Sequence, residues 1–212
     1  MTEERAPTRS LRAAGIAGLI FSVLITISFV IFRSFPPGVS GIPPEGRDPW
    51  LVGLYLIPFA GIAFLWFLAT VRRRIGRLED QFFATVFLGS GLLFVAMLFV
   101  ASAAASAAVA MARFQGDAAT SDTAFLFGEA FAETLFYVFA IKMAAAFMLV
   151  SSTIGRRTNA FPGWLVAGGA VAGIVLLFSV SFFQPLAVIF PLWVVAVSLL
   201  LLRADPGTGS AE

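Results

Sequence analysis

Residues 51–77, with the sequence LVGLYLIPFAGIAFLWFLATVRRRIGR, decide the fold of this chain. The segment 51–71 carries no charge, and as a helix it would extend about 30 Å, the thickness of the hydrocarbon core of a bilayer. Four arginines follow directly at positions 72–77, which is typical of the cytoplasmic end of a transmembrane helix. The stretch therefore predicts a membrane span with a defined direction.

The rest of the chain has a similar composition. Of its 212 residues, 59% are hydrophobic and 12% are charged, whereas soluble domains carry about 25% charged residues. Cysteine and histidine are both absent, which excludes disulfides, thiolate nucleophiles and the commonest metal ligand and general base. We therefore expect an integral membrane protein that is not an enzyme, with no catalytic residues, no metal, no cofactor and no nucleic-acid partner.

The apolar runs predict an all-α, polytopic transmembrane bundle of six spans in a single domain from 13 to 203. The expected spans are residues 13–32, 51–71, 81–113, 124–152, 162–182 and 186–202, between a cytoplasmic tail at 1–12 and a disordered tail at 204–212. The proline-rich stretch 33–50 is expected to be a surface loop with Trp50 as an interfacial anchor. A five-span alternative would fuse 162–202 into one helix of about 60 Å, and Pro185 argues against it.

The distribution of arginine predicts the orientation. With six spans, both termini lie on one side, and that side carries ten arginines against three on the other. We therefore expect both termini to be cytoplasmic, in a bacterial inner membrane. Arg72, Arg73, Arg74 and Arg77 can also hold anionic lipid headgroups, although most such clusters are plain topology determinants.

Two of the expected helices are longer than a membrane requires. Spans 81–113 and 124–152 would each measure roughly 45 Å, so we expect their surplus to form a helical hairpin on the outer side. The stretch Ala101–Ala112, ASAAASAAVAMA, permits close approach of the two backbones. Glu129 and Glu133 share a helix face, and they form either a solvated surface or a possible cation or proton site.

Lys142 is the only lysine, and it lies in the apolar run FYVFAIKMAAAF near the expected midplane of the bilayer. Inserting a lysine at that depth costs about 2.5–3.5 kcal/mol, so its ammonium group should face protein or water. Its candidate partners are the side chains of Tyr55, Tyr137, Ser179 and Ser181. Backbone carbonyls that Pro58 and Pro191 leave without a helical donor are further candidates. Either Lys142 attracts an anion or an anionic headgroup into an outward-open cavity, or it only fixes helix packing.

Small residues offer faces for helix association. Gly169 and Gly173 form a GxxxG motif, which packs helices within one chain or between chains. Together with Ala101–Ala112, this motif could bind a membrane-protein partner or a second copy of the chain, besides membrane lipids. The favoured function is a non-enzymatic interaction or accessory subunit. The alternative is a transporter or a lipid- or anion-binding protein with a cavity around Lys142, Tyr137, Tyr55 and Ser179.

The order of features resembles a family of membrane proteins. A charged N-terminal tail precedes the first span, an arginine-rich loop follows the second, and RRTNAFPGWLVAGGAVAG at 156–173 precedes a proline-containing last span. In these features the chain resembles small multi-spanning inner-membrane proteins of bacteria, actinobacteria in particular, which are uncharacterised. The resemblance implies a location in the inner membrane and carries no activity.

Overall fold

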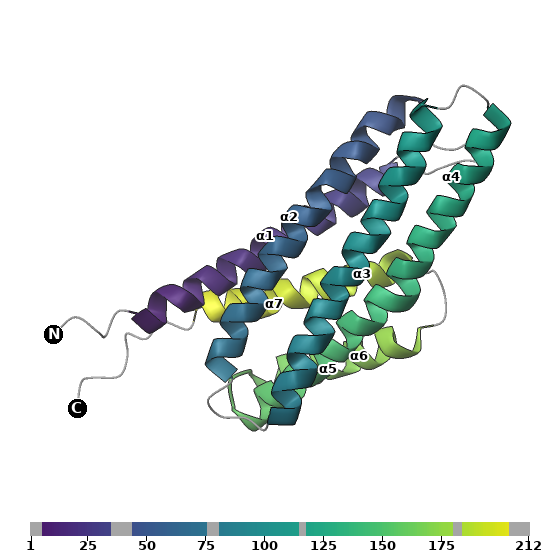
Figure 1. Cartoon of the computed structure of the whole chain (residues 1–212). Coiled ribbons are helices and arrows are strands. Elements are labelled where there is room, and N and C mark those ends of the chain that lie inside the picture. The colour runs from purple at the N-terminus through teal and green to yellow at the C-terminus, as the bar shows by residue number, and fades with distance from the viewer. Residues whose placement is uncertain (1–5, 35–43, 76–80, 115–117, 180–183, 204–212) are drawn as a thin grey trace, which may run out of the picture.

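The computed structural model describes residues 6–34, 44–75, 81–114, 118–179 and 184–203, and these ranges contain helices and no strands. The elements are α1 (Ala6–Ser34), α2 (Pro44–Ile75), α3 (Gln81–Phe114), α4 (Ala118–Glu133), the π-helical segment η1 (Thr134–Ala140), α5 (Ile141–Arg157), α6 (Gly163–Phe178), the 3₁₀ segment η2 (Gln184–Val188) and α7 (Ile189–Arg203). Because α4, η1 and α5 follow one another without a break, the described chain forms six helical rods (Figure 1).

The helices have the length and composition of membrane spans. In the described ranges, five are long and apolar enough to cross a bilayer, with α4–η1–α5 counted as one. The remaining helix, α6, is also apolar but has only 16 residues, which corresponds to about 24 Å. The prediction of a helical, multi-pass membrane bundle is therefore confirmed, while six complete crossings stay a prediction.

The alternative that fuses residues 162–202 into one helix is wrong. α6 ends at Phe178, and the next described segment begins at Gln184 as a 3₁₀ turn that leads into α7. Figure 1 shows α7 running back past α6 toward the N-terminal part of α1. Pro191 lies in the first turn of α7, where its missing N–H removes no hydrogen bond within the helix.

Phenylalanine rings form the centre of the bundle. Phe64 of α2 is fully buried and lies against rings from four other helices. Its ring centroid is 5.0 Å from that of Phe21 on α1, 5.3 Å from Phe94 on α3, 5.4 Å from Phe147 on α5 and 5.7 Å from Phe190 on α7. A single side chain therefore joins five helices through tilted and edge-to-face contacts.

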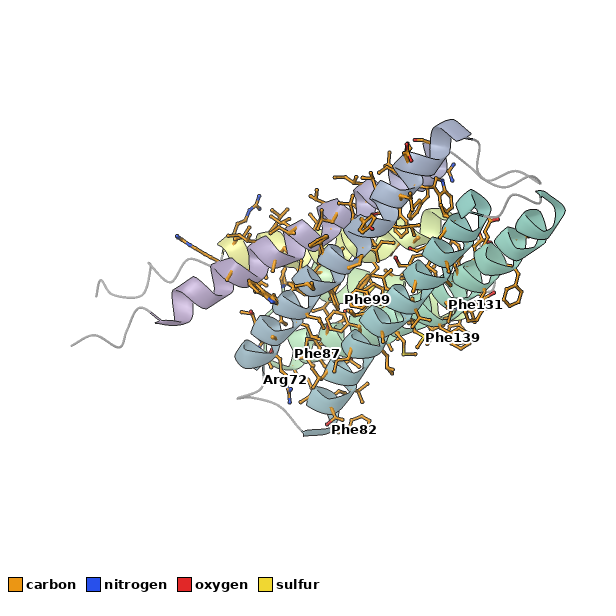
Figure 2. All side chains as sticks on the ribbon, turned by 45° about the horizontal axis from the view of Figure 1, so that its top comes forward. Arg72, Phe82, Phe87, Phe99, Phe131 and Phe139 are labelled. Carbon is orange, nitrogen blue, oxygen red and sulfur yellow. The ribbon has the colours of Figure 1, made fainter. Side chains whose placement is uncertain are left out.

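Other aromatic side chains point away from the bundle. Phe82, Phe131 and Phe139 project outward in Figure 2, whereas Phe87 lies between the helices. The exposed fraction is 66% for Phe82 and 1% for Phe87. Large exposed apolar side chains are expected where lipid, rather than water, surrounds a protein.

The first and last described helices meet at one end of the bundle. A Cβ atom built on Gly15 of α1 would lie 2.6 Å from Cγ of Leu202 on α7, so these two helices pack closely there. We call this end the terminal end. The opposite end, where α1 ends at Ser34 and α2 begins, is called the Arg33 end. α3 also ends and α4 begins at the Arg33 end (Figure 1).

The long hairpin expected from the sequence consists of α3 and α4–η1–α5. A Cβ atom on Gly128 would lie 2.6 Å from Cβ of Ala108 and 3.5 Å from the Ala104 carbonyl oxygen, so the alanine-rich stretch does pack closely within the chain. The hairpin runs beside the N-terminal part of α2 rather than alone (Figure 1). Its height above a membrane stays a prediction.

Two expected boundaries are wrong. α2 begins at Pro44, so Trp50 is helical and buried rather than a surface anchor, and its ring packs 4.8 Å from that of Phe32. α4 begins at Ala118, inside the expected polar loop. Proline is tolerated in a first helical turn, which explains the early start of α2. The expected C-terminal tail and residues 1–5 of the N-terminal tail lie outside the described residues.

Candidate ligand-binding pocket

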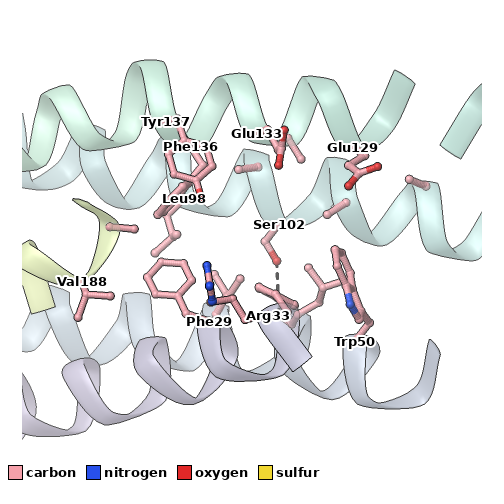
Figure 3. A pocket seen from close by; sticks show the side chains of 18 residues that line it. Phe29, Arg33, Trp50, Leu98, Ser102, Glu129, Glu133, Phe136, Tyr137 and Val188 are labelled. Atoms are coloured by element: carbon pink, nitrogen blue, oxygen red, sulfur yellow. Dashed lines mark hydrogen bonds between the residues drawn. The ribbon is translucent and has the colours of Figure 1, made fainter. Parts of the chain in front are cut away.

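A pocket of about 600 Å³ opens between the helices at the Arg33 end (Figure 3). One wall comes from α1 and α2, the opposite wall from α3, α4 and η1, and Ala187 and Val188 of η2 contribute to the base. Volumes of 300–1,000 Å³ are typical of small-molecule sites. The pocket is therefore large enough to hold a ligand or part of a lipid.

The part of the pocket nearest the bundle centre is apolar. Phe29 precedes Arg33 by one helical turn on α1, and Ile57 lies two turns after Trp50 on α2, so both are deeper than the helix ends. Leu98 and Phe136 line the same depth from the opposite wall. These side chains are themselves apolar, and the Arg33 guanidinium extends to the level of Phe29 and Leu98 (Figure 3).

The part nearest the Arg33 end is charged. Arg33 extends from α1 toward the gap, and the carboxylates of Glu129 and Glu133 point into it from α4 (Figure 3). Glu133 and Arg33 both lie near enough to the Tyr137 hydroxyl to act on it electrostatically. The two carboxylates, one helical turn apart, also repel each other. Among the described residues, neither carboxylate is held in an ion pair.

A serine in the pocket wall compensates for a proline in α2. Because Pro58 has no N–H, the carbonyl of Leu54 lacks its usual helical donor. The Ser102 hydroxyl of α3 donates a hydrogen bond of 3.4 Å to that carbonyl oxygen. Pro58 therefore does free a carbonyl, as the sequence predicts, but its partner is Ser102 and not Lys142.

The opposite wall contains an irregular helical segment. In η1 the hydrogen bonds skip one more residue than in an α-helix, and the Ile141 N–H donates to the Phe136 carbonyl. Two pocket residues, Phe136 and Tyr137, come from this segment. π-helical turns within long α-helices occur frequently at functional sites.

Lys142 lies outside the pocket, at the end of α6. Its Nζ atom donates a hydrogen bond of 2.9 Å to the Leu176 carbonyl, one of 3.1 Å to the Ser179 hydroxyl and another to the Ser179 carbonyl. The Ser179 hydroxyl in turn donates to the Leu176 carbonyl at 2.9 Å. The last carbonyls of a helix have no donor within the helix, so the ammonium group satisfies them and opposes the partial negative charge there.

No family model, curated protein or solved structure matches this chain. The chemistry available to the pocket follows from its own groups, which are one guanidinium, two carboxylates and one phenol over an apolar base. Groups of this kind can form hydrogen bonds and ion pairs with a charged ligand. With no cysteine or histidine in the chain, the pocket carries none of the usual activated nucleophile and base pairs.

The structure divides the predicted site residues into two groups. Lys142 and Ser179 contact each other, while Tyr137, Glu129 and Glu133 line the pocket. Tyr55 belongs to neither group, because its side chain is 72% exposed on the outside of α2. Ser181 lies outside the described residues.

Arg33 is the pocket residue that the sequence prediction missed. It entered the prediction only as one of three arginines on the side poor in arginine. That position could have indicated a functional role for Arg33, because the positive-inside bias does not explain an arginine on the side poor in arginine. Its position across the pocket from α4 could not be inferred from the sequence, because this position depends on how the helices are arranged.

The predicted lipid-headgroup cluster is described only in part. Arg72 is exposed near the end of α2, Arg73 and Arg74 belong to α2 but their side chains are not described, and Arg77 lies outside the described residues. Arg157, at the end of α5, lies over the ring of Phe83 at 4.4 Å. A role of the cluster in binding headgroups stays a prediction.

The GxxxG motif packs within the chain. A Cβ atom on Gly173 would lie 2.9 Å from Cγ of Leu149 and 3.2 Å from the Ala145 carbonyl oxygen, both on α5. One on Gly169 would lie 2.5 Å from Nε1 of Trp193 on α7. Both glycines are buried, so this face holds α6 against its neighbours. An oligomer formed through other surfaces stays a prediction.

Proposed function

We propose that this protein binds a membrane lipid in the pocket at the Arg33 end, with the lipid headgroup directed toward the outer side of the membrane. The observation that carries the proposal is the order of the lining, which is apolar toward the bundle centre and charged toward the helix ends. A membrane lipid has the same order of parts, with apolar acyl chains followed by a charged headgroup. The protein acts as a non-enzymatic lipid-binding protein. This is one of the functions expected from the sequence, but the proposed binding site is the pocket and not the surroundings of Lys142.

The orientation in this proposal follows from the arginines. Arg72, Arg157 and Arg203 lie at ends of helices that are directed toward the terminal end, opposite the pocket. The positive-inside bias then puts the termini in the cytoplasm of a bacterial cell and the pocket in the outer half of the inner membrane. A lipid would enter from the outer leaflet.

The orientation can be tested with cysteine labelling, because the chain contains no cysteine. Asp48→Cys at the Arg33 end should react with a membrane-impermeant maleimide in spheroplasts, whereas Arg203→Cys should react only after lysis. Both side chains are exposed. Labelling of Arg203→Cys in intact spheroplasts would reverse the orientation.

Lipid binding can be tested by filling the pocket. Ala105 lines it, and Ala103 is exposed on the other side of α3. Ala105→Trp should abolish retention of lipid by the detergent-purified protein, measured by native mass spectrometry, whereas Ala103→Trp should leave it unchanged. Equal retention by the two variants would place any bound lipid elsewhere and end the proposal.

An accessory subunit is the second candidate. The observation that favours it is a stacked pair on α4, where the rings of Phe127 and Phe131 lie 6.2 Å apart at an interplanar angle of 4°. Phe127 is 73% exposed, and on a hairpin outside the membrane such a pair would suit a protein partner. Affinity purification should then recover a stoichiometric partner that Phe127→Ser with Phe131→Ser loses and Phe82→Ser retains. A chain that purifies without a partner argues against this function.

A further inference from the structure

The pocket presents opposite charges to its occupant from opposite walls. Arg33 comes from α1, while Glu129 and Glu133 come from α4 across the gap (Figure 3). The carboxylates belong to successive turns of one helix, so they face the gap as a pair. A ligand in the charged part therefore meets a cation on one side and two anions on the other.

This arrangement discriminates between headgroups. A purely anionic headgroup could bind Arg33 but would bring a third negative charge close to Glu129 and Glu133. A lipophilic cation would satisfy the carboxylates but meet the guanidinium. A headgroup with a phosphate and an ammonium joined by a short linker satisfies both walls, because guanidinium binds phosphate and ammonium donates to carboxylates.

The apolar base determines where the rest of such a ligand lies. Phe29, Leu98 and Phe136 are deeper than the two carboxylates, on the side of the bundle centre, and the Arg33 guanidinium extends to the level of Phe29 and Leu98 (Figure 3). Acyl chains directed past Phe29 toward Val188 leave the phosphate at the level of the Arg33 guanidinium and the ammonium nearer the helix ends, at Glu133 (Figure 3). Charge and depth thus select the same orientation of the same molecule.

We propose that the pocket binds a zwitterionic phospholipid with a primary ammonium headgroup, its phosphate at Arg33 and its ammonium between Glu129 and Glu133. The inference rests on the proposed lipid-binding function and adds the class of lipid. A primary ammonium is favoured over a quaternary one because it has three N–H donors for the carboxylates, whereas a quaternary ammonium has none.

The test is a competition between lipids that differ only in their headgroup. The full chain in detergent is mixed with phosphatidylethanolamine, phosphatidylcholine and phosphatidylglycerol of identical acyl chains, and bound lipid is measured by native mass spectrometry. We expect phosphatidylethanolamine to be preferred by about tenfold, the effect of one charge-assisted hydrogen bond. Equal retention of all three lipids would overturn the headgroup assignment and leave lipid binding intact. Retention of none of them would overturn lipid binding itself.

Two variants separate the charged walls. Glu129→Gln with Glu133→Gln should remove the preference for phosphatidylethanolamine over phosphatidylglycerol. Arg33→Gln should instead weaken the binding of both lipids. Asp48→Asn and Arg72→Gln, outside the pocket lining, are the matched controls and should retain the wild-type preference. Far-ultraviolet circular dichroism confirms that each variant is folded. Tight binding of tetraphenylphosphonium that improves in Arg33→Gln, without any preference for phosphatidylethanolamine, would identify a cation site and overturn the proposal.

Discussion

Lys142 and Ser179 join the middle of the continuous α4–η1–α5 rod to the end of α6. The Nζ atom of Lys142 on α5 lies 3.1 Å from the Ser179 hydroxyl oxygen and also donates to the Ser179 carbonyl, immediately after the last residue of α6. The only lysine of the chain thus caps the C-terminal end of α6, the described apolar helix that is too short to be counted as a membrane span. The contact gives a partly buried cation three acceptors from the protein itself.

Replacing Lys142 should destabilise the fold and leave the pocket unaffected. Lys142→Met removes three hydrogen bonds, and at the strengths measured within membranes we expect a loss of about 1–3 kcal/mol in the free energy of unfolding. Unfolding by sodium dodecyl sulfate in mixed micelles measures the loss, and Ser179→Ala should lose less. Because Lys142 does not line the pocket, lipid retention should remain. Loss of lipid with unchanged stability would instead support the ligand-binding role predicted from the sequence.

Two adjacent glycines of α6 provide a matched pair. A Cβ atom on Gly169 would lie 2.5 Å from Nε1 of Trp193 and overlap the Ser152 hydroxyl, whereas one on Gly168 meets nothing within 4 Å. Gly169→Ala should therefore cost about 1–3 kcal/mol through overpacking. Gly168→Ala should be neutral or stabilise by up to about 1 kcal/mol, since alanine favours a helix. Thermal unfolding in detergent compares them, and equal midpoints would show that α6 is not packed through Gly169.

The helices could be predicted from the sequence because their signals are local. Charge-free runs and the arginines after them identify long helices such as α2 without knowledge of any neighbour. The end of α5 is equally local: Asn159 adopts a left-handed φ of 52°, and the Ala160 N–H donates to the Gly155 carbonyl at 3.0 Å. Asparagine two residues past a helix and proline shortly after are ordinary stop signals. The start of α4 at Ala118 was missed because polar residues are tolerated in a first turn.

The pocket could not be predicted because it depends on which helices meet. Glu129 and Glu133 were identified as a pair, but the position of Arg33 opposite them depends on the helix arrangement that puts α1 and α4 on opposite sides of the pocket. The π-helical segment η1 lies between Glu133 and Lys142 and has more residues per turn than an α-helix, so regular helical spacing does not give the relative directions of these two side chains.

The hydrogen bond from Ser102 should matter only because of Pro58. Ser102→Ala leaves the Leu54 carbonyl without a donor and should cost about 0.6–1.7 kcal/mol, the range measured for hydrogen bonds between membrane helices. In a Pro58→Ala background the new backbone N–H can donate to Leu54, so the same substitution should cost almost nothing. The four unfolding free energies form a double-mutant cycle, and a coupling energy of zero would contradict the compensation.

Phe64 should be the side chain whose loss is felt most widely, because its ring contacts four other helices. In a soluble core, Phe→Ala costs about 3–5 kcal/mol, part of which is the transfer of the ring out of water. Within a bilayer that part is reduced, since the inserted but unfolded chain exposes the ring to lipid, and only the packing remains. We therefore expect Phe64→Ala to cost more than about 1 kcal/mol and less than the soluble value.

The matched control for Phe64 is Phe59 on the same helix, which is 61% exposed. Phe59→Ala exchanges contact with lipid for contact with lipid, so its unfolding free energy in mixed micelles should equal that of the wild type. If both substitutions cost the same, the phenylalanine cluster would contribute no packing energy of its own. A loss of unfolding free energy confined to Phe64→Ala would instead show that packing between aromatic rings, rather than the hydrophobic effect, holds α2 and the four helices that Phe64 contacts together.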